Sequence, residues 1–163
     1  MLHSCEALDP VVLQPAGFIT SAFNSAGVHD YRGAARYIAR LPYGRNTNRE
    51  NPLVVFEENR GTCSTKHALL RRLAAEQALD ITLMIGVYEM NERNTPGVGR
   101  VLEAHRLTCL PEAHCYLRAH RKRVDSTREI AVAPAGQISN FLHEEEIEPE
   151  QIGAYKSNFT DVF

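Results

Sequence analysis

Residues 59–80 read NRGTCSTKHALLRRLAAEQALD and carry the strongest structural signal in the chain. From Cys63 onward, alanine and leucine recur with helical spacing, and most of the residues between them favour helices. This pattern predicts a long helix over Cys63–Asp80. Gly61 and Thr62 come directly before it, and a glycine allows the chain to turn tightly into a helix. The most secure element of the protein therefore begins at a cysteine.

Shorter elements are expected on both sides of this helix. Upstream, Asp30 is a suitable N-cap for a helix over Tyr31–Arg40. Downstream, Ile81–Tyr88 is apolar and rich in β-branched residues, which is typical of a buried strand. The segment His114–Asp125 is expected to form two strands joined by a tight turn. Helices that precede a group of strands indicate an α+β fold.

The remaining segments carry weaker signals. The first 28 residues are mostly small and apolar, and we expect short strands or irregular structure there. A short helix is expected at Val101–Leu107. The acidic stretch Glu144–Glu150 predicts the end and cap of a surface helix with a solvated face, and a final helix is expected from Glu150 onward.

Composition limits the classes of protein to which the chain can belong. It has 163 residues, of which 44% are hydrophobic and 23% charged, an ordinary globular balance that argues against disorder. We expect one domain over residues 1–163, with a motif-bearing core at about 53–130. With 18 Lys+Arg against 20 Asp+Glu, no nucleic-acid partner is expected. No apolar run is long enough to predict a membrane span.

The first residues, MLHSCEALDP, do not form a secretory signal, because they have neither a basic start nor an apolar run. We therefore expect a cytoplasmic protein whose four cysteines are free thiols. Nothing in the sequence indicates an oligomeric state.

Three positions combine into a candidate site, namely Cys63, His114 and Asp125. A thiolate is the reactive form of cysteine, and the N-terminus of a helix stabilises both a thiolate and an oxyanion. A histidine base and a carboxylate that orients it complete such a site. If the strands form a hairpin that turns near Ala119–His120, His114 and Asp125 lie opposite each other on one face, whereas a one-residue shift separates them.

The same residues carry a resemblance to a known family. The segment Asn59–Leu70 (NRGTCSTKHALL) resembles the cysteine motif of the transglutaminase-like superfamily, in which a glycine and then a catalytic cysteine open a long helix. Glu112–Leu117 (EAHCYL) is similar to its histidine strand, and Arg123–Thr127 (RVDST) looks like its aspartate motif. The resemblance spans about residues 56–127. The chain departs from the family at Cys115, where an aromatic residue is frequent, and it contains no Trp.

This resemblance implies a papain-like or transglutaminase-like α+β fold, with the catalytic helix packed on an antiparallel sheet. It also implies cysteine-dependent acyl transfer on amides or esters, as in a peptidase, amidase, deamidase or transglutaminase, through a thioester intermediate. Cys63, His114 and Asp125 would be the catalytic triad, with no cofactor or metal. The expected partner is a protein or peptide substrate, or a small amide. Tyr43, Asn46 and Asn59 are candidates for the second oxyanion donor.

Three other interpretations remain open. The fold could serve as a non-catalytic binding module, or the basic hairpin at Arg118–Arg123 could bind an acidic partner. A structural zinc site is disfavoured, because no C-x2-C pair occurs and His114 and Cys115 should point to opposite faces of a strand. His67 is expected to pack, or to support the site from behind its reacting groups, on the exposed face of the long helix. The other cysteines are expected to be inert, and these are Cys5, Cys109 and Cys115.

Overall fold

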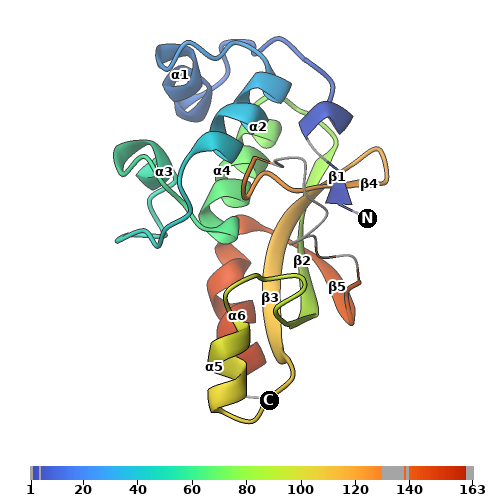
Figure 1. The fold of residues 1–163 in the computed structure, drawn as a ribbon. Coiled ribbons are helices and arrows are strands. Elements are labelled where there is room, and N and C mark those ends of the chain that lie inside the picture. The colour runs from blue at the N-terminus through green and yellow to red at the C-terminus, as the bar shows by residue number, and fades with distance from the viewer. Residues whose placement is uncertain (1, 4, 130–137, 139, 161–163) are drawn as a thin grey trace.

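A computed structural model describes residues 2–3, 5–129, 138 and 140–160 of the chain, and within them helices accompany one five-stranded sheet (Figure 1). The expected α+β class is confirmed. The strands are β1 (Leu2–His3), β2 (Ile81–Met90), β3 (Leu110–Ala119), β4 (Lys122–Val124) and β5 (His143–Ile147). The helices are α1 (Phe18–Ser25), α2 (Tyr31–Arg40), α3 (Val54–Glu57), α4 (Cys63–Glu76), α5 (Gly99–Ala104) and α6 (Ile152–Thr160), with short 3-10 helices η1 (Cys5–Ala7) and η2 (Pro149–Gln151).

The sheet has the strand order β1-β4-β3-β2-β5. All neighbouring strands are antiparallel except β1, which runs parallel to β4. The long strands β2 and β3 form its centre, and Gly86 pairs with His114 in their register. Because β4 pairs only with the last residues of β3, the earlier part of β3 has no partner from β4. His114 lies in that part of the strand.

Helix α4 packs against the helices α1, α2 and α3 and against the strands β2 and β3. Its first turn is fixed by a capping box, in which Thr62 and Thr65 bond each other's backbone N–H groups. Leu69, Leu70 and Leu73 are almost fully buried in the main core. Figure 1 shows α4 between α2 and the long strands. The helix ends at Glu76, earlier than the expected Asp80.

Helix α1 corrects the prediction of strands or irregular structure in the first 28 residues. It begins after Gly17, which has no side chain to cap it. The cap comes instead from Glu76 of α4, whose carboxylate accepts hydrogen bonds from the N–H groups of Ile19 at 3.0 Å and Thr20 at 2.7 Å. A negative charge also suits a helix N-terminus. The start signal is therefore absent from the local sequence.

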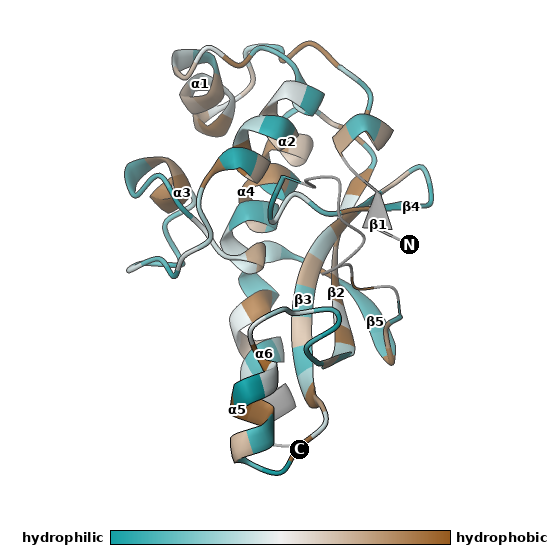
Figure 2. Cartoon of the chain, in the orientation of Figure 1, coloured by the Kyte–Doolittle hydropathy of each residue, from teal (hydrophilic) through white to brown (hydrophobic). Residues whose placement is uncertain are grey.

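Strand β5 corrects the prediction of a helix end at Glu144–Glu150. Its backbone pairs antiparallel with β2, and of its side chains only Ile147 is fully buried. Figure 2 shows most of β5 as hydrophilic. The expected final helix is confirmed, since η2 and then α6 follow this strand. No helix in the described part of the chain combines the length and the apolar character that a membrane span needs.

Candidate active site

Cys63 is the first residue of α4 and is 6% exposed. At this position the N–H groups of Cys63 and Ser64 have no acceptor within the helix, and the helix dipole favours a negative charge. Gly61 is needed for space rather than for a turn, because a Cβ atom there would lie 2.9 Å from Cγ of Lys66. The local sequence thus places a thiol where an anion is stabilised.

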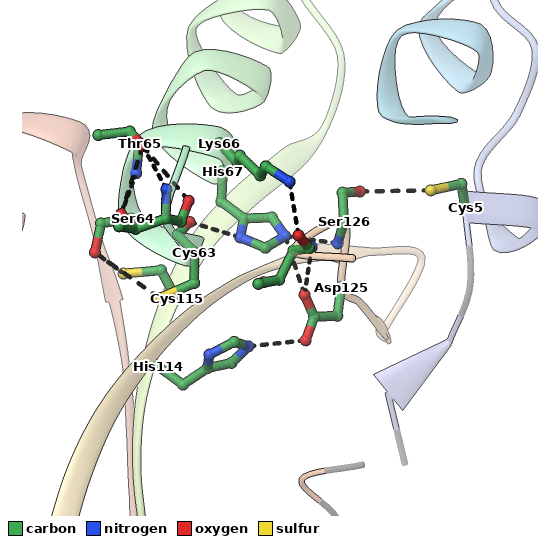
Figure 3. A network of polar contacts seen from close by, with 12 residues as sticks. Cys5, Cys63, Ser64, Thr65, Lys66, His67, His114, Cys115, Asp125 and Ser126 are labelled. Atoms are coloured by element: carbon green, nitrogen blue, oxygen red, sulfur yellow. Dashed lines mark hydrogen bonds and ion pairs between the residues drawn. The ribbon is translucent and has the colours of Figure 1, made fainter. Parts of the chain in front are cut away.

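His114 and Asp125 form a direct pair, with 2.8 Å between Nε2 of the ring and Oδ2 of the carboxylate (Figure 3). His114 comes from β3, and Asp125 directly follows β4. The other carboxylate oxygen, Oδ1, accepts the backbone N–H of Thr127 at 2.8 Å. Since Nε2 of His114 is engaged, Nδ1 is the ring nitrogen left for the thiol of Cys63.

The hairpin that brings this pair together has a different register from the expected one. It turns at His120 and Arg121, which both have positive φ angles (47° and 64°), as a two-residue hairpin turn requires. Leu117 pairs with Val124, so a continued β4 would place Asp125 opposite residue 116 rather than opposite His114. The difference is two positions along β3, which keeps both side chains on one face. The pair is therefore diagonal.

The charges of the three groups support one another. Burial raises the pKa of Asp125, but the charge of His114 and its hydrogen bond outweigh this and hold that pKa well below its usual range. Burial lowers the pKa of His114, but the negative charges of Asp125 and Cys63 raise it to about 10. The hydrogen bond from the Cys115 thiol lowers the pKa of Cys63 most, and the charge of His114 lowers it further against burial. Both shifts favour the thiolate form of Cys63 and the imidazolium form of His114.

His67 lies next to this pair and is fully buried, which corrects the prediction of an exposed position. Its Nε2 accepts the backbone N–H of Ser126 at 2.8 Å, so the proton is on Nδ1, which donates to the carbonyl oxygen of Cys63 at 2.8 Å. Burial lowers the pKa of His67 and favours this neutral form. One imidazole thereby joins the backbone of Cys63 to the loop that carries Asp125.

Two lysines that the sequence did not single out also surround the site. Lys66 is fully buried and donates to the carbonyl oxygens of Leu41 at 2.6 Å and Thr127 at 2.7 Å, which holds the loop after Asp125. Burial lowers its pKa to about 8. Lys156 of α6 donates to the carbonyl oxygen of Ala113 at 2.8 Å, and the charge of Cys63 helps to raise its pKa against burial. No local signal predicts either contact, because the acceptors are backbone atoms distant in sequence.

The oxyanion-donor candidates differ in their surroundings. The amide of Asn46 is already used, since it donates to the carbonyl oxygen of Arg60 at 3.0 Å and accepts from the Thr65 hydroxyl at 2.7 Å. Asn59 is exposed just after α3. Tyr43 pairs by backbone with Gly61, and burial and the charge of Cys63 both raise the pKa of its phenol. Of the three candidates, Tyr43 is therefore the one whose phenol responds to the charge of Cys63.

The structure also shows the surroundings of the residues on which the zinc-site and basic-hairpin interpretations depend. Both ring nitrogens of His67 are engaged, and within the described residues no group of three or more His, Cys, Asp or Glu side chains is arranged to hold a metal ion. In the basic hairpin, Arg123 pairs with Glu144, and His120 lies 3.0 Å from Asp9. Much of the hairpin's charge is thus paired inside the chain.

Comparisons with protein-family models, with curated proteins and with solved structures give no match for this chain.

Proposed function

We propose that this chain is a cysteine-dependent acyl-transfer enzyme of the papain-like or transglutaminase-like type, acting on amides or esters. Cys63 is its nucleophile, His114 its acid and base, and Asp125 the residue that orients His114. The observation that carries this proposal is the 2.8 Å hydrogen bond between His114 and Asp125 beside a thiol at a helix N-terminus. A nucleophile, a base and an orienting carboxylate are the groups that acyl transfer needs.

The proposed reaction has two halves. The thiolate of Cys63 attacks the carbonyl carbon, and the oxygen takes up negative charge beside the free N–H groups of the first turn of α4. The carbon then loses its leaving group, which takes the proton from Nδ1 of His114, and a thioester remains on Cys63. His114 next accepts a proton from water or an amine, which attacks the thioester and releases the thiol.

The acceptor decides which enzyme this is. Water as acceptor makes the protein a peptidase, amidase or deamidase, whereas an amine makes it a transglutaminase. The choice depends on how well the occupied site excludes water. The substrate class proposed is a protein or peptide, or a small amide, since each presents the same carbonyl group to Cys63.

Acylation by a chromogenic ester tests the proposal. With p-nitrophenyl acetate, we expect a burst of p-nitrophenol and a mass gain of one acetyl group, mapped to Cys63. The variants Cys63→Ser and His114→Gln should lose the burst, and Cys109→Ser should keep it. An added amine that shortens the lifetime of the acetyl group identifies an amine acceptor. Acetylation spread over all cysteines and unchanged in His114→Gln would contradict the proposal and favour a binding module.

A further inference from the structure

A second thiol lies beside the proposed nucleophile. Cys115 comes from β3 and donates to the hydroxyl oxygen of Ser64 at 3.7 Å, and Sγ of Cys63 lies 4.0 Å from the same oxygen. The thiol of Cys115 is also the neighbour that lowers the pKa of Cys63 most. Figure 3 shows the side chains of Cys63 and Cys115 converging from the helix and the strand. The sulfur atoms are therefore neighbours, although the residues are far apart in sequence.

The two thiols differ in protonation. The pKa of Cys63 is lowered, as described above, which favours its thiolate form. The hydrogen bond to Cys63, together with burial, raises the pKa of Cys115 well above its usual value, so Cys115 keeps its proton. The other cysteines have other surroundings: Cys5 contacts the hydroxyl of Ser126 at 3.5 Å, and Cys109 is partly exposed. Only an ionised thiol reacts readily with peroxide, which singles out Cys63.

We propose that Cys63 and Cys115 are an oxidative modification site for small hydroperoxides, in which Cys63 is oxidised first and Cys115 then closes an intramolecular disulfide. The proposal uses the thiolate of Cys63 and does not require acyl transfer. Cys63 is 6% exposed, so a reagent of the size of hydrogen peroxide suits the site. This assigns a role to Cys115, which the sequence predicted to be inert.

The chemistry balances without a further reagent. The thiolate of Cys63 attacks one oxygen of the hydroperoxide, the O–O bond breaks, and the departing oxygen takes a proton to leave as water or an alcohol. The product is a sulfenic acid on Cys63. The sulfur of Cys115 then attacks the sulfur of Cys63, the S–O bond breaks, and the released hydroxide combines with the proton of Cys115 as water. Two thiols lose two electrons, which the peroxide gains.

The structure also accounts for the order of these steps. The main cause of the raised pKa of Cys115 is its hydrogen bond to the thiolate of Cys63. That cause disappears when Cys63 becomes a neutral sulfenic acid, so Cys115 ionises more easily at the moment when it must attack. The disulfide would join α4 to β3 and block the nucleophile, and a thiol reductant would restore it.

The test treats the reduced full-length protein with hydrogen peroxide and follows it by mass spectrometry. We expect the loss of two hydrogen atoms, reversed by dithiothreitol, and a cross-linked peptide pair containing Cys63 and Cys115. In Cys115→Ser, which keeps a hydroxyl donor towards Cys63, the same treatment should add oxygen atoms to Cys63 up to the sulfinic acid. Cys5→Ser and Cys109→Ser are matched controls that should form the disulfide as the wild type does.

Several outcomes would overturn the proposal. One is oxidation of wild-type Cys63 to sulfinic acid at the rate seen in Cys115→Ser, with Cys115 still open to alkylation. Another is a disulfide between other cysteines. If Cys63 reacts with peroxide no faster than Cys109, its thiol is not ionised, and the proposed function fails as well. If the disulfide forms but the ester burst is absent, only the proposed function fails. Circular dichroism of Cys115→Ser, with Cys115→Ala as a second variant, verifies the fold.

Discussion

The Nδ1 atom of His67 donates a hydrogen bond of 2.8 Å to the carbonyl oxygen of Cys63, one turn earlier in α4. The opposite ring nitrogen of His67 accepts from Ser126, next to Asp125, at 2.8 Å. A single buried ring therefore links the backbone of Cys63 to the loop that carries Asp125. Removing it disturbs the alignment of the site without removing a reacting group.

The first prediction concerns this bridge. His67→Ala should lose about 1–3 kcal/mol of unfolding free energy, because two buried backbone groups lose their partner. His67→Gln should recover part of this, since its amide can accept from Ser126. Urea unfolding measures the loss, and the rate of ester acylation measures the alignment. His67 acts through other residues and is a positioning residue, so acylation should slow in His67→Ala while Cys63 still reacts. An equal loss in His67→Ala and His67→Gln would show that only the volume of the ring matters.

The second prediction concerns Asp125→Asn, which keeps the shape of the side chain and removes its charge. The negative charge of Asp125 helps to raise the pKa of His114 to about 10, so this variant should lower that pKa. With less positive charge on His114 near neutral pH, the pKa of Cys63 should rise. The shift of the His114 ring resonances with pH, followed by NMR, checks the first effect directly. An unchanged His114 titration in Asp125→Asn would contradict the assigned pair.

The third prediction concerns the pH dependence of stability. The raised pKa of His114 stabilises the fold fully below about pH 6.5, its unfolded value, and this is lost as pH rises towards about 10. The lowered pKa of Cys63 stabilises the fold above its unfolded value of about 8.5, and this is lost as pH falls. Between about pH 6.5 and 8.5 the contribution of His114 falls while that of Cys63 rises, so the stability from the pair has a plateau there. In urea unfolding, the free energy of unfolding of the wild type should exceed that of the double variant Cys63→Ser/His114→Gln by the largest amount on this plateau. A difference that only rises or only falls with pH would refute the ion pair.

The fourth prediction concerns Lys156. Its charge acts on Cys63 from α6 and lowers the pKa of the thiol. In Lys156→Met the acidic limb of the Cys63 alkylation profile should therefore move to higher pH. Lys156→Arg keeps the positive charge and should stay near the wild type. A profile that is the same in all three proteins would mean that Lys156 has only a packing role.

Local signals explain which elements the sequence predicts well. Helix α2 covers the expected residues Tyr31–Arg40, and Asp30 caps it by accepting the N–H of Gly33 at 2.8 Å. Helix α4 begins at the expected Cys63, and the strand expected at Ile81–Tyr88 runs on to Met90. In each case the pattern of apolar residues and the cap lie within the element itself.

The errors arise where distant residues decide the structure. Helix α1 is capped from α4, and β5 forms because β2 offers an edge, so neither has a local signal. Helix α5 begins at Gly99, before the expected Val101, and ends at Ala104 rather than at Leu107. The turn at His120 and Arg121 contains neither Gly nor Asn, which would have marked its positive φ angles.

In the candidate site, too, some features follow from the local sequence and others depend on contacts between distant residues. The face shared by His114 and Asp125 could be predicted, because strand alternation preserves it under a two-residue change of register. The contact between Cys115 and Cys63 could not be predicted, because strand alternation puts Cys115 and His114 on opposite faces of β3. In the structure both of these side chains nevertheless act on Cys63. The roles of Lys66 and His67 depend on a loop that only the fold brings to α4.

The most direct test of the account is the pH dependence of iodoacetamide alkylation at Cys63, in the wild type and in His114→Ala. Peptide mapping follows Cys63 separately from Cys5 and Cys109. We expect rapid alkylation of wild-type Cys63 down to about pH 6, and in His114→Ala a profile shifted to higher pH, towards that of an ordinary thiol of pKa about 8.5. Slow alkylation of Cys63 in the wild type, unchanged in His114→Ala, would contradict the Cys–His pair and with it the proposed acyl-transfer enzyme.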